Sequence, residues 1–255
     1  AHIKTCCLTR KYRDTVACDN VNVSIERGSI YGLIGRNGAG KTTFMKMICG
    51  MTKPTSGTIL YDGEEKSDLG KIGALIELPS LNPKLSAYAN IKLKCLAYGI
   101  TDKQYIMERL EMTGLSLICH KKVEKFSLGM RQRLGIAMAL VGDPELLVLD
   151  EPINGLDPQG IQEIRELITF INGKYGTTII ISSHILEELA KFVTHYSIID
   201  NGKILEESTM EDLEKRCTDS IVIKSSEPDR VIEGLNGMGI TDHKKTGKKT
   251  IIVYA

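Results

Sequence analysis

The sequence predicts an α/β fold built on a parallel sheet with helices on both of its faces. Two apolar runs, LLVLD at 146–150 and TTIIISS at 177–183, have the composition of buried strands. The segment between them, residues 157–176, is amphipathic, and Pro158 lies close to its start, where a helix accepts proline. A strand, a helix and a strand in this order, with continuous apolar strands, are typical of a parallel sheet that is buried on both sides.

Before these strands, the chain has two regions of different character. Residues 1–34 are typical of short strands separated by turns, and TSGTILYDGEE at 55–65 is typical of a hairpin. From about residue 86 to residue 140, three segments place apolar residues every three to four positions, which predicts helices. We therefore expect strands at the amino-terminal end and a helical subdomain at about residues 80–145.

The carboxyl-terminal part is predicted to be a separate small unit. YSIIDNGKILEE at 196–207 is typical of a hairpin with Asn201–Gly202 at its turn. Residues 210–255 then pass through a helix, a strand, a second helix and a hairpin that ends in TIIVYA. We expect residues 1–209 to form the main domain and residues 210–255 a small α/β tail. The last strand of this tail is either a sheet edge or the stump of a longer domain.

Composition narrows the classes of function. The 255 residues carry 33 Lys and Arg against 32 Asp and Glu, so the net charge of +1 gives no electrostatic footprint for nucleic acid. The longest apolar runs are shorter than the roughly 18–20 residues that cross a membrane, and the first residues do not resemble a secretory signal. The seven cysteines form no Cys-x-x-Cys pair, which favours reduced thiols in a cytoplasmic protein. Membrane association would therefore come through a partner.

A phosphate-binding loop follows a strand-like segment and opens a helix. GLIGRNGAGKTT at 32–43 contains the complete P-loop pattern in its required context. Its glycines let successive backbone N–H groups face phosphates at a helix N-terminus. Lys41 brings a point charge to the outer phosphates, and Thr42 offers a hydroxyl group to Mg²⁺. The residues expected to bind the nucleotide are Gly35, Arg36, Asn37, Gly38, Ala39, Gly40, Lys41, Thr42 and Thr43.

Three more polar residues follow the two buried strands. Asp150 emerges at the carboxyl end of LLVLD, where α/β sheets place their ligands, and is positioned to hold Mg²⁺. Glu151 is placed to polarise the water that attacks the γ-phosphate. His184 comes off the next strand, so its ring is expected at the same edge, within reach of a γ-phosphate oxygen. Each is commonplace at a strand end, but beside a P-loop they predict a hydrolytic site with Glu151, His184 and Lys41 as catalytic residues.

The stretch FSLGMRQRLGIA at 126–137 begins like a capped helix, because Ser127 can accept from the first free backbone N–H groups. Gly129 lies in the first turn, where a plain helix favours almost any other residue. Beside a P-loop, this glycine predicts a helix N-terminus that is left open for a phosphate. A GTPase would need an Asn-Lys-x-Asp motif, which is missing, and a small-molecule kinase would explain neither Glu151 nor Gly129.

In this order and at this spacing, the motifs resemble those of the ATP-binding subunits of ABC transporters over about residues 3–210. GRNGAGKTT is similar to the Walker A motif, LLVLDEP to Walker B, NGLDP with Asp157 to the D-loop, and SSHILEE to the switch-histidine loop. FSLGMRQRLGIA occupies the place of the family signature. Tyr12 takes the place of the aromatic residue that stacks on adenine, and Val16 that of a neighbour of the same base.

The resemblance implies a P-loop NTPase with a RecA-like core, an antiparallel β-subdomain and an inserted α-helical subdomain. It implies ATP and Mg²⁺ as ligands, with Thr42 and Asp150 at the metal. Two such subunits, identical or different, would close head to tail on two ATP molecules, so that Ser127 and Gly129 act on the nucleotide of the second subunit. The other implied partner is a separate integral-membrane permease, which would hold the chain at the cytoplasmic face of the cell membrane.

Two positions depart from the family pattern. The usual Leu-Ser-Gly-Gly-Gln of the signature is Phe-Ser-Leu-Gly-Met at 126–130, so that Leu128 replaces a glycine and Met130 the glutamine. The glutamine of the Q-loop is replaced by Glu77, which either binds the metal or serves only as the hinge to the helical subdomain. These variants are most similar to the bacitracin and lantibiotic self-protection branch, which implies removal of antimicrobial peptides from the membrane.

Two other functions stay open on the sequence. A soluble ABC-type ATPase of translation or DNA repair usually has two ATPase halves in one chain or a long coiled-coil insertion, and neither is found in these 255 residues. An accessory protein that binds ATP only as a closure signal would not need Glu151. We therefore predict an ATPase subunit that drives a separate permease.

Overall fold

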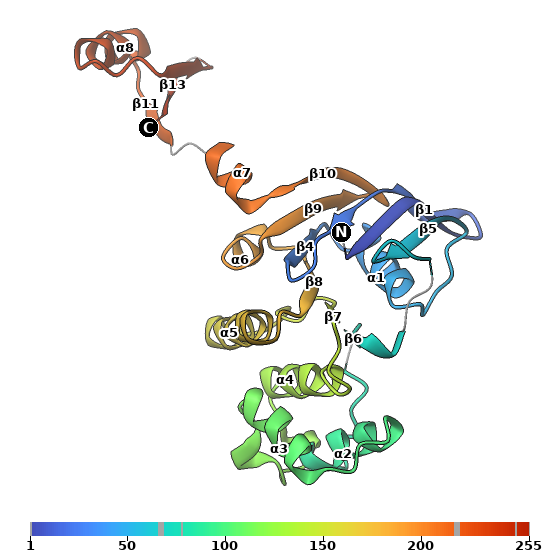
Figure 1. The fold of residues 1–255 in the computed structure, drawn as a ribbon. Helices are drawn as coiled ribbons and strands as arrows, with labels where there is room; N and C mark the ends of the chain where they lie inside the picture. The colour runs from blue at the N-terminus through green and yellow to red at the C-terminus, as the bar shows by residue number, and fades with distance from the viewer. Residues whose placement is uncertain (1, 66–68, 78, 217–219, 248, 255) are drawn as a thin grey trace. The chain divides into compact units, whose positions relative to one another are not determined.

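Figure 1 shows the computed structural model, which describes residues 2–65, 69–77, 79–216, 220–247 and 249–254. The chain divides into two compact units, Ala1–Ser208 and Thr209–Ala255. Within the described ranges, no helix is long and apolar enough to cross a membrane. Six of the seven cysteines lie in these ranges as free thiols, and Cys217 lies outside them.

The first unit is centred on a six-stranded sheet. Its strands, in order across the sheet, are β10 (Lys203–Thr209), β9 (His195–Asp200), β4 (Ile30–Ile34), β8 (Thr178–Ser183), β7 (Leu146–Leu149) and β6 (Ile72–Leu75). The strands from β9 to β6 run parallel to one another. Every residue of β4, β7 and β8 is buried, as expected of strands that are covered on both faces. The predicted α/β fold with a parallel sheet is confirmed.

A second, antiparallel sheet lies over helix α1 (Lys41–Ile48). Its strands are β1 (Ile3–Tyr12), β2 (Thr15–Val21), β3 (Ser24–Ile25) and β5 (Ser56–Tyr61), and β1 pairs with the other three. One hydrophobic cluster joins Leu8 of β1, Phe44 of α1 and Leu33 of β4. Helix α1 therefore packs between the two sheets, which fixes the phosphate loop at its N-terminus.

Three helices form a subdomain between β6 and β7 in the chain. They are α2 (Ala87–Ala97), α3 (Lys103–Met112) and α4 (Leu128–Ala139), with short 3₁₀ turns at Ser116–Ile118 and Val123–Lys125, and another at Leu69–Lys71 before β6. The helices begin at Ser86, Asp102 and Ser127, whose side chains accept backbone hydrogen bonds as N-caps. Figure 1 shows the three helices grouped together in green. Buried residues from all three, such as Ile91, Leu110 and Leu134, form one apolar cluster.

Helix α5 (Pro158–Tyr175) connects β7 with β8 and buries one apolar stripe. Asp157 is its N-cap and Pro158 its first residue, which satisfies the free amides at the helix start without breaking the helix. Gly176 ends the helix in the left-handed conformation. The four-residue helix α6 (Leu186–Leu189) follows β8.

The second unit contains a small sheet with the order β11-β13-β12 and two helices. Its elements are α7 (Met210–Arg216), β11 (Ser220–Lys224), α8 (Pro228–Gly237), β12 (His243–Thr246) and β13 (Thr250–Tyr254). Both strand pairs are antiparallel. Helix α8 contacts β12, because Asp229 pairs with Lys245 and Asn236 lies 2.9 Å from the ring Nε2 of His243.

Candidate functional site

The loop between β4 and α1 is fixed by close contacts with its neighbours. Gly40 has a φ of +110°, and a Cβ atom there would lie 2.3 Å from the carbonyl oxygen of Ala17. A Cβ atom on Gly35 would lie 2.3 Å from the carbonyl oxygen of Ile199. The packing of the chain itself therefore requires both glycines. Gly38 has a φ of +81° and open space around it, so backbone conformation alone favours glycine there.

Hydrogen bonds tie the same loop to its surroundings. The amide of Gly35 donates to the carbonyl oxygen of Ser183 at 3.2 Å, and the amide of Gly202 donates to the loop at 2.9 Å. The thiol of Cys18 lies 3.6 Å from the carbonyl oxygen of Gly40, and burial raises the pKa of this thiol to about 12, so that it stays protonated and donates. The sequence predicts Gly202 only as a hairpin turn, because nothing local shows that this turn returns to the phosphate loop.

The ammonium group of Lys41 lies inside the loop. Its side chain is 5% exposed, and Nζ donates to the carbonyl oxygens of Gly35 at 2.7 Å and Arg36 at 3.1 Å. Nζ also lies 3.1 Å from Oε1 of Glu151. This buried ammonium group, surrounded by carbonyl and carboxylate oxygens, is placed to receive the oxygens of a phosphate.

The carboxylate of Asp150 is buried at the end of β7. Its Oδ2 accepts a hydrogen bond from the hydroxyl of Thr42, and its Oδ1 accepts one from the hydroxyl of Ser182, both at 2.6 Å. Within the described part of the chain, no cationic side chain pairs with it. A buried carboxylate without a cation fits a divalent metal ion, and carboxylate and hydroxyl oxygens are ligands that Mg²⁺ prefers. Thr42 and Asp150 are thus the residues that fit Mg²⁺.

Glu151 is held at three points. Its backbone has a φ of +49°, and its amide donates to the hydroxyl of Ser182 at 2.9 Å. Its Oε2 lies 2.9 Å from Nδ1 of His184, while its Oε1 faces Lys41. The structure therefore brings Glu151, His184 and Lys41 together. The hydroxyl of Ser182 serves both acidic residues, a role that the sequence alone does not indicate because it depends on the pairing of β7 with β8.

Lys41, Thr42 and Glu151 border a cavity of about 350 Å³, whereas Asp150 and His184 are not part of its lining. Residues of β2, the phosphate loop, the end of β7 and the β9–β10 turn line it, and Val16 is among them. Tyr12 is not part of this lining: the residue is 42% exposed, and the guanidinium carbon of Arg10 lies 4.4 Å from its ring centroid. The structure therefore places Val16, but not Tyr12, at the wall of the cavity.

Comparison with known proteins agrees with this arrangement. Residues 18–154 match the family model described as ABC transporter, and residues 122–190 match a second model, described as an AAA domain, putative AbiEii toxin, Type IV TA system. The chain is 42% identical to the uncharacterized ABC transporter ATP-binding protein YcbN of Bacillus subtilis, over 99% of this chain and 84% of that protein. This chain belongs to the ABC transporter family.

Other ABC proteins are similar over most of their length. The bacitracin transport ATP-binding protein BcrA of Bacillus licheniformis is 45% identical over 90% of this chain and 77% of its own length. The lantibiotic transport ATP-binding protein SrtF of Streptococcus pyogenes is 47% identical over 78% and 86%, respectively. These relatives do not favour a role in translation or DNA repair.

Solved ABC structures share the fold. The dimer of the ATP-binding cassette MJ0796 in a post-hydrolysis state with ADP and Pi has a TM-score of 0.72 at 26% identity, covering 82% of this chain and 98% of that chain. CbiO1 of Clostridium perfringens, part of an ABC transporter complex, has a TM-score of 0.76 at 27% identity, covering 92% and 94%, respectively. The chain is the ATP-binding, ATP-hydrolysing subunit of an ABC transporter.

In this ABC subunit, the residues of the signature and the D-loop are not part of the cavity lining. The hydroxyl of Ser127 accepts from the amide of Met130 at 3.2 Å, and Oδ1 of Asp157 accepts from the amide of Gly160 at 3.1 Å, so each caps its own helix. A Cβ atom on Gly129 would meet only a Leu156 side-chain atom, at 3.7 Å. The packing of the subunit therefore gives no reason for a glycine at residue 129, in contrast to residues 35 and 40.

Glu77 of the Q-loop position is not in the lining of the phosphate cavity either. Its φ is +63°, and its Oε1 lies 2.6 Å from Nζ of Lys46 on helix α1. Both residues line a separate cavity of about 340 Å³ between β6 and the helical subdomain, together with Tyr98 and Gly135.

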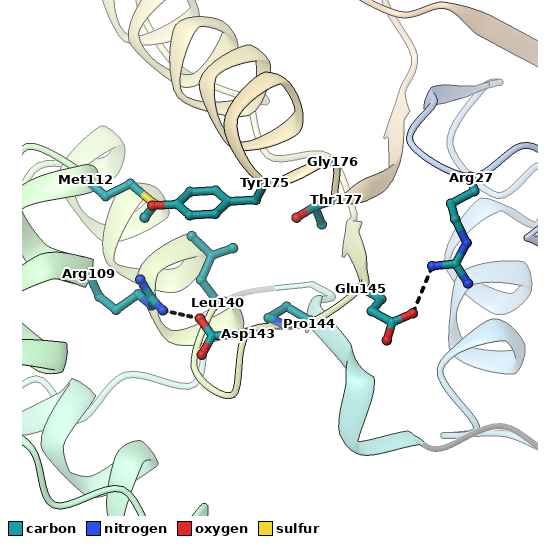
Figure 2. Close-up of a pocket in the computed structure, with 10 residues that line it drawn as sticks. All are labelled: Arg27, Arg109, Met112, Leu140, Asp143, Pro144, Glu145, Tyr175, Gly176 and Thr177. Atoms are coloured by element: carbon teal, nitrogen blue, oxygen red, sulfur yellow. Dashed lines mark hydrogen bonds and ion pairs between the residues drawn. The ribbon is translucent and has the colours of Figure 1, made fainter.

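A third cavity, of about 260 Å³, lies at the opposite end of the parallel strands (Figure 2). Glu145 precedes β7 and Thr177 precedes β8, so the cavity is at their amino-terminal ends. Its charged side chains pair with one another, Arg109 with Asp143 and Arg27 with Glu145 at 2.9 Å, as the dashed lines in Figure 2 show. The charges balance, and the cavity does not resemble a phosphate site.

Proposed function

We propose that this subunit hydrolyses Mg²⁺·ATP at the cavity beside the phosphate loop and thereby drives a separate permease that removes antimicrobial peptides. The convergence of Lys41, Asp150 and Glu151 at the carboxyl ends of parallel strands supports the site. The similarity to BcrA and SrtF, named for bacitracin and lantibiotic transport, supports the cargo.

Each group at the site has its own role in the proposed hydrolysis. The amides of the phosphate loop and the ammonium group of Lys41 bind the β- and γ-phosphates. Thr42 and Asp150 hold Mg²⁺, which would offset the negative charge of the phosphate oxygens. The carboxylate of Glu151 orients the attacking water and accepts its proton. His184 donates to a γ-phosphate oxygen and keeps Glu151 in place through their 2.9 Å contact.

Arrival of ATP changes the partners of Lys41. Nζ of Lys41 lies 3.1 Å from Oε1 of Glu151. The γ-phosphate carries more negative charge than one carboxylate and draws the ammonium group away from Glu151. The glutamate then keeps His184 and the water as partners, which prepares it as a base only when ATP is present.

A second subunit would complete the site. The N-terminus of α4 has Ser127 as its cap, and a Cβ atom on Gly129 would meet only Leu156, at 3.7 Å, so its backbone amides can approach a γ-phosphate bound by the other subunit. The separate permease would contact the surface next to the Glu77 cavity, because Lys94 of α2 lines this cavity and Leu93 and Leu96 of the same helix are exposed. This contact would keep the subunit at the cytoplasmic face of the membrane.

Glu151→Gln tests the proposed hydrolysis. Because glutamine keeps the shape but accepts no proton, ATP hydrolysis should fall about 100-fold or more. ATP binding should persist, and the variant should accumulate as an ATP-dependent dimer in gel filtration. Glu145→Gln, at the other end of β7, is the matched control and should hydrolyse ATP normally. Unchanged turnover in Glu151→Gln would remove Glu151 as the base.

The cargo needs a test in cells. The subunit would be expressed together with a candidate permease in a bacitracin-sensitive bacterium, with the Glu151→Gln subunit as the control. Growth at higher bacitracin or lantibiotic concentrations with the native subunit alone supports the proposal. Equal sensitivity of both strains, despite a co-purifying complex, would contradict this cargo and leave the ATPase assignment intact.

A further inference from the structure

Two side chains of helix α1, one turn apart, contact acidic residues that follow the neighbouring strands β7 and β6. Thr42 donates to Asp150, which follows β7, and Lys46 pairs with Glu77, which follows β6. Lys46 is four positions after Thr42, so the two side chains lie on one face of the helix, about 6 Å apart along its axis. The amide of Asp150 donates to Leu75 of β6 at 2.8 Å, which brings the two acidic segments together.

The acidic residue at position 77 brings a negative charge close to a site for ATP and Mg²⁺. Its side chain is 64% exposed, and the residue is in the left-handed conformation, so packing does not decide where the carboxylate points. The contact that does fix it is the 2.6 Å ion pair with Lys46, whose side chain is 31% exposed.

We propose that Lys46 is the positioning residue for Glu77: it holds the Glu77 carboxylate beside the second turn of α1, one turn beyond Thr42, which contacts Asp150. Lys46 also cancels the charge that glutamate adds at this position. Without Lys46, the carboxylate is free to turn toward the metal and the phosphates. The inference rests on the proposed Mg²⁺ site and assigns a function to Lys46 that the P-loop pattern does not contain.

Nucleotide binding to the purified chain tests this idea. The dissociation constant of a fluorescent ATP analogue would be measured in EDTA and in Mg²⁺. The constant in EDTA divided by the constant in Mg²⁺ gives the factor by which the metal increases affinity. For Lys46→Met this ratio should rise about threefold to fivefold, because a freed carboxylate repels bare nucleotide and attracts Mg²⁺. In a Glu77→Gln background, Lys46→Met should change the ratio by less than about twofold.

A double-mutant comparison separates positioning from bare charge. If Lys46 acts only as a charge, its removal changes the ratio equally with Glu77 and with Gln at position 77, which would overturn the proposal. No change in either background would overturn it as well. Lys46→Arg keeps the charge and should behave like the native chain. A native chain that gains nothing from Mg²⁺ would instead contradict the metal site itself.

Lys71→Met provides the matched control. Lys71 pairs with Glu145 at 2.5 Å, at the amino-terminal end of β6, whereas Glu77 follows the carboxyl end of the same strand. The control removes the same charge from an ion pair of the same kind, but far from the phosphate loop. Its ratio should equal that of the native chain.

Discussion

The hydroxyl of Thr42 donates a 2.6 Å hydrogen bond to the carboxylate of Asp150 across 108 residues of sequence. The contact forms because α1 starts at the carboxyl end of β4, while Asp150 follows β7, only one strand beyond the neighbour of β4. A hydroxyl donor and a buried carboxylate are thereby set side by side by the fold itself. This preorganisation is the central feature of the proposed metal site.

Thr42→Val should distinguish the contribution of Mg²⁺ to nucleotide affinity from the contribution of the phosphate loop. Valine keeps the shape of threonine but leaves Asp150 with one hydroxyl donor fewer, so the free energy of unfolding should fall by about 1–3 kcal/mol. Nucleotide binding in EDTA should change little, whereas the gain in affinity on adding Mg²⁺ should shrink. Denaturant unfolding and ATP titration check both effects. Thr43→Val is the control and should keep the native gain in affinity on adding Mg²⁺. If Thr42→Val gains as much affinity from Mg²⁺ as the native chain does, Thr42 is not part of the metal site.

Ser182→Ala should disturb both acidic residues through one hydroxyl. The fully buried side chain donates to Asp150 and accepts from the amide of Glu151. We expect a loss of about 1–3 kcal/mol of stability, with a larger fall in kcat than in ATP affinity, because Glu151 loses its backbone anchor. Ser183→Ala removes a hydroxyl that accepts from Ile185 instead and should spare kcat. Equal effects of both variants on kcat would assign Ser182 a merely structural role.

Much of the fold follows from local patterns in the sequence. The continuous apolar runs before Asp150 and His184 become the buried parallel strands β7 and β8, because such runs gain most from burial on both faces. The glycine spacing around Lys41 predicts the phosphate loop, because a strand, tight turn and helix start are local events.

The contacts that the sequence does not predict depend on pairing between distant segments. Ser182 serves Asp150 only because β8 lies beside β7, and Gly202 reaches the phosphate loop only because its hairpin lies beside β4. Glu77 stands out in the sequence as a departure from the family, but its ion pair with Lys46 requires the position of α1 relative to β6. Sequence periodicity carries no information about such contacts.

Glu145 links stability to acidic pH. Hydrogen bonds from Lys71 and Arg27 hold the pKa of its carboxyl at about 2, below the ordinary value of 4.5. The unfolded chain therefore binds this proton first, so the stabilisation is present above pH 4.5 and is lost as the pH falls toward 2. The side chain is 37% exposed, so screening keeps the effect below about 1 kcal/mol. Urea unfolding at pH 5, 4 and 3 should show Glu145→Gln converging with the native chain, and a constant difference would contradict the linkage.

Gly129→Ala should affect function without harming the fold. A Cβ atom there meets only Leu156, at 3.7 Å, and residue 129 lies in the first turn of α4. Alanine in a helix is more stable than glycine by about 0.5–1 kcal/mol, so the melting temperature should stay the same or rise. ATP binding by the monomer should also stay the same. ATP-dependent dimerisation and hydrolysis should fall, because the added methyl group occupies the space through which the helix amides approach a phosphate of the second subunit.

Gly40→Ala is the matched comparison, with the opposite outcome. Its Cβ atom would lie 2.3 Å from the carbonyl oxygen of Ala17 at a φ of +110°, so this variant should be destabilised and should lose ATP binding in the monomer itself. Calorimetry and nucleotide titration on both variants therefore separate a glycine required by the chain from one required by a partner. A destabilised Gly129→Ala, or one that hydrolyses ATP normally as a dimer, would contradict the role of the α4 N-terminus in the second site.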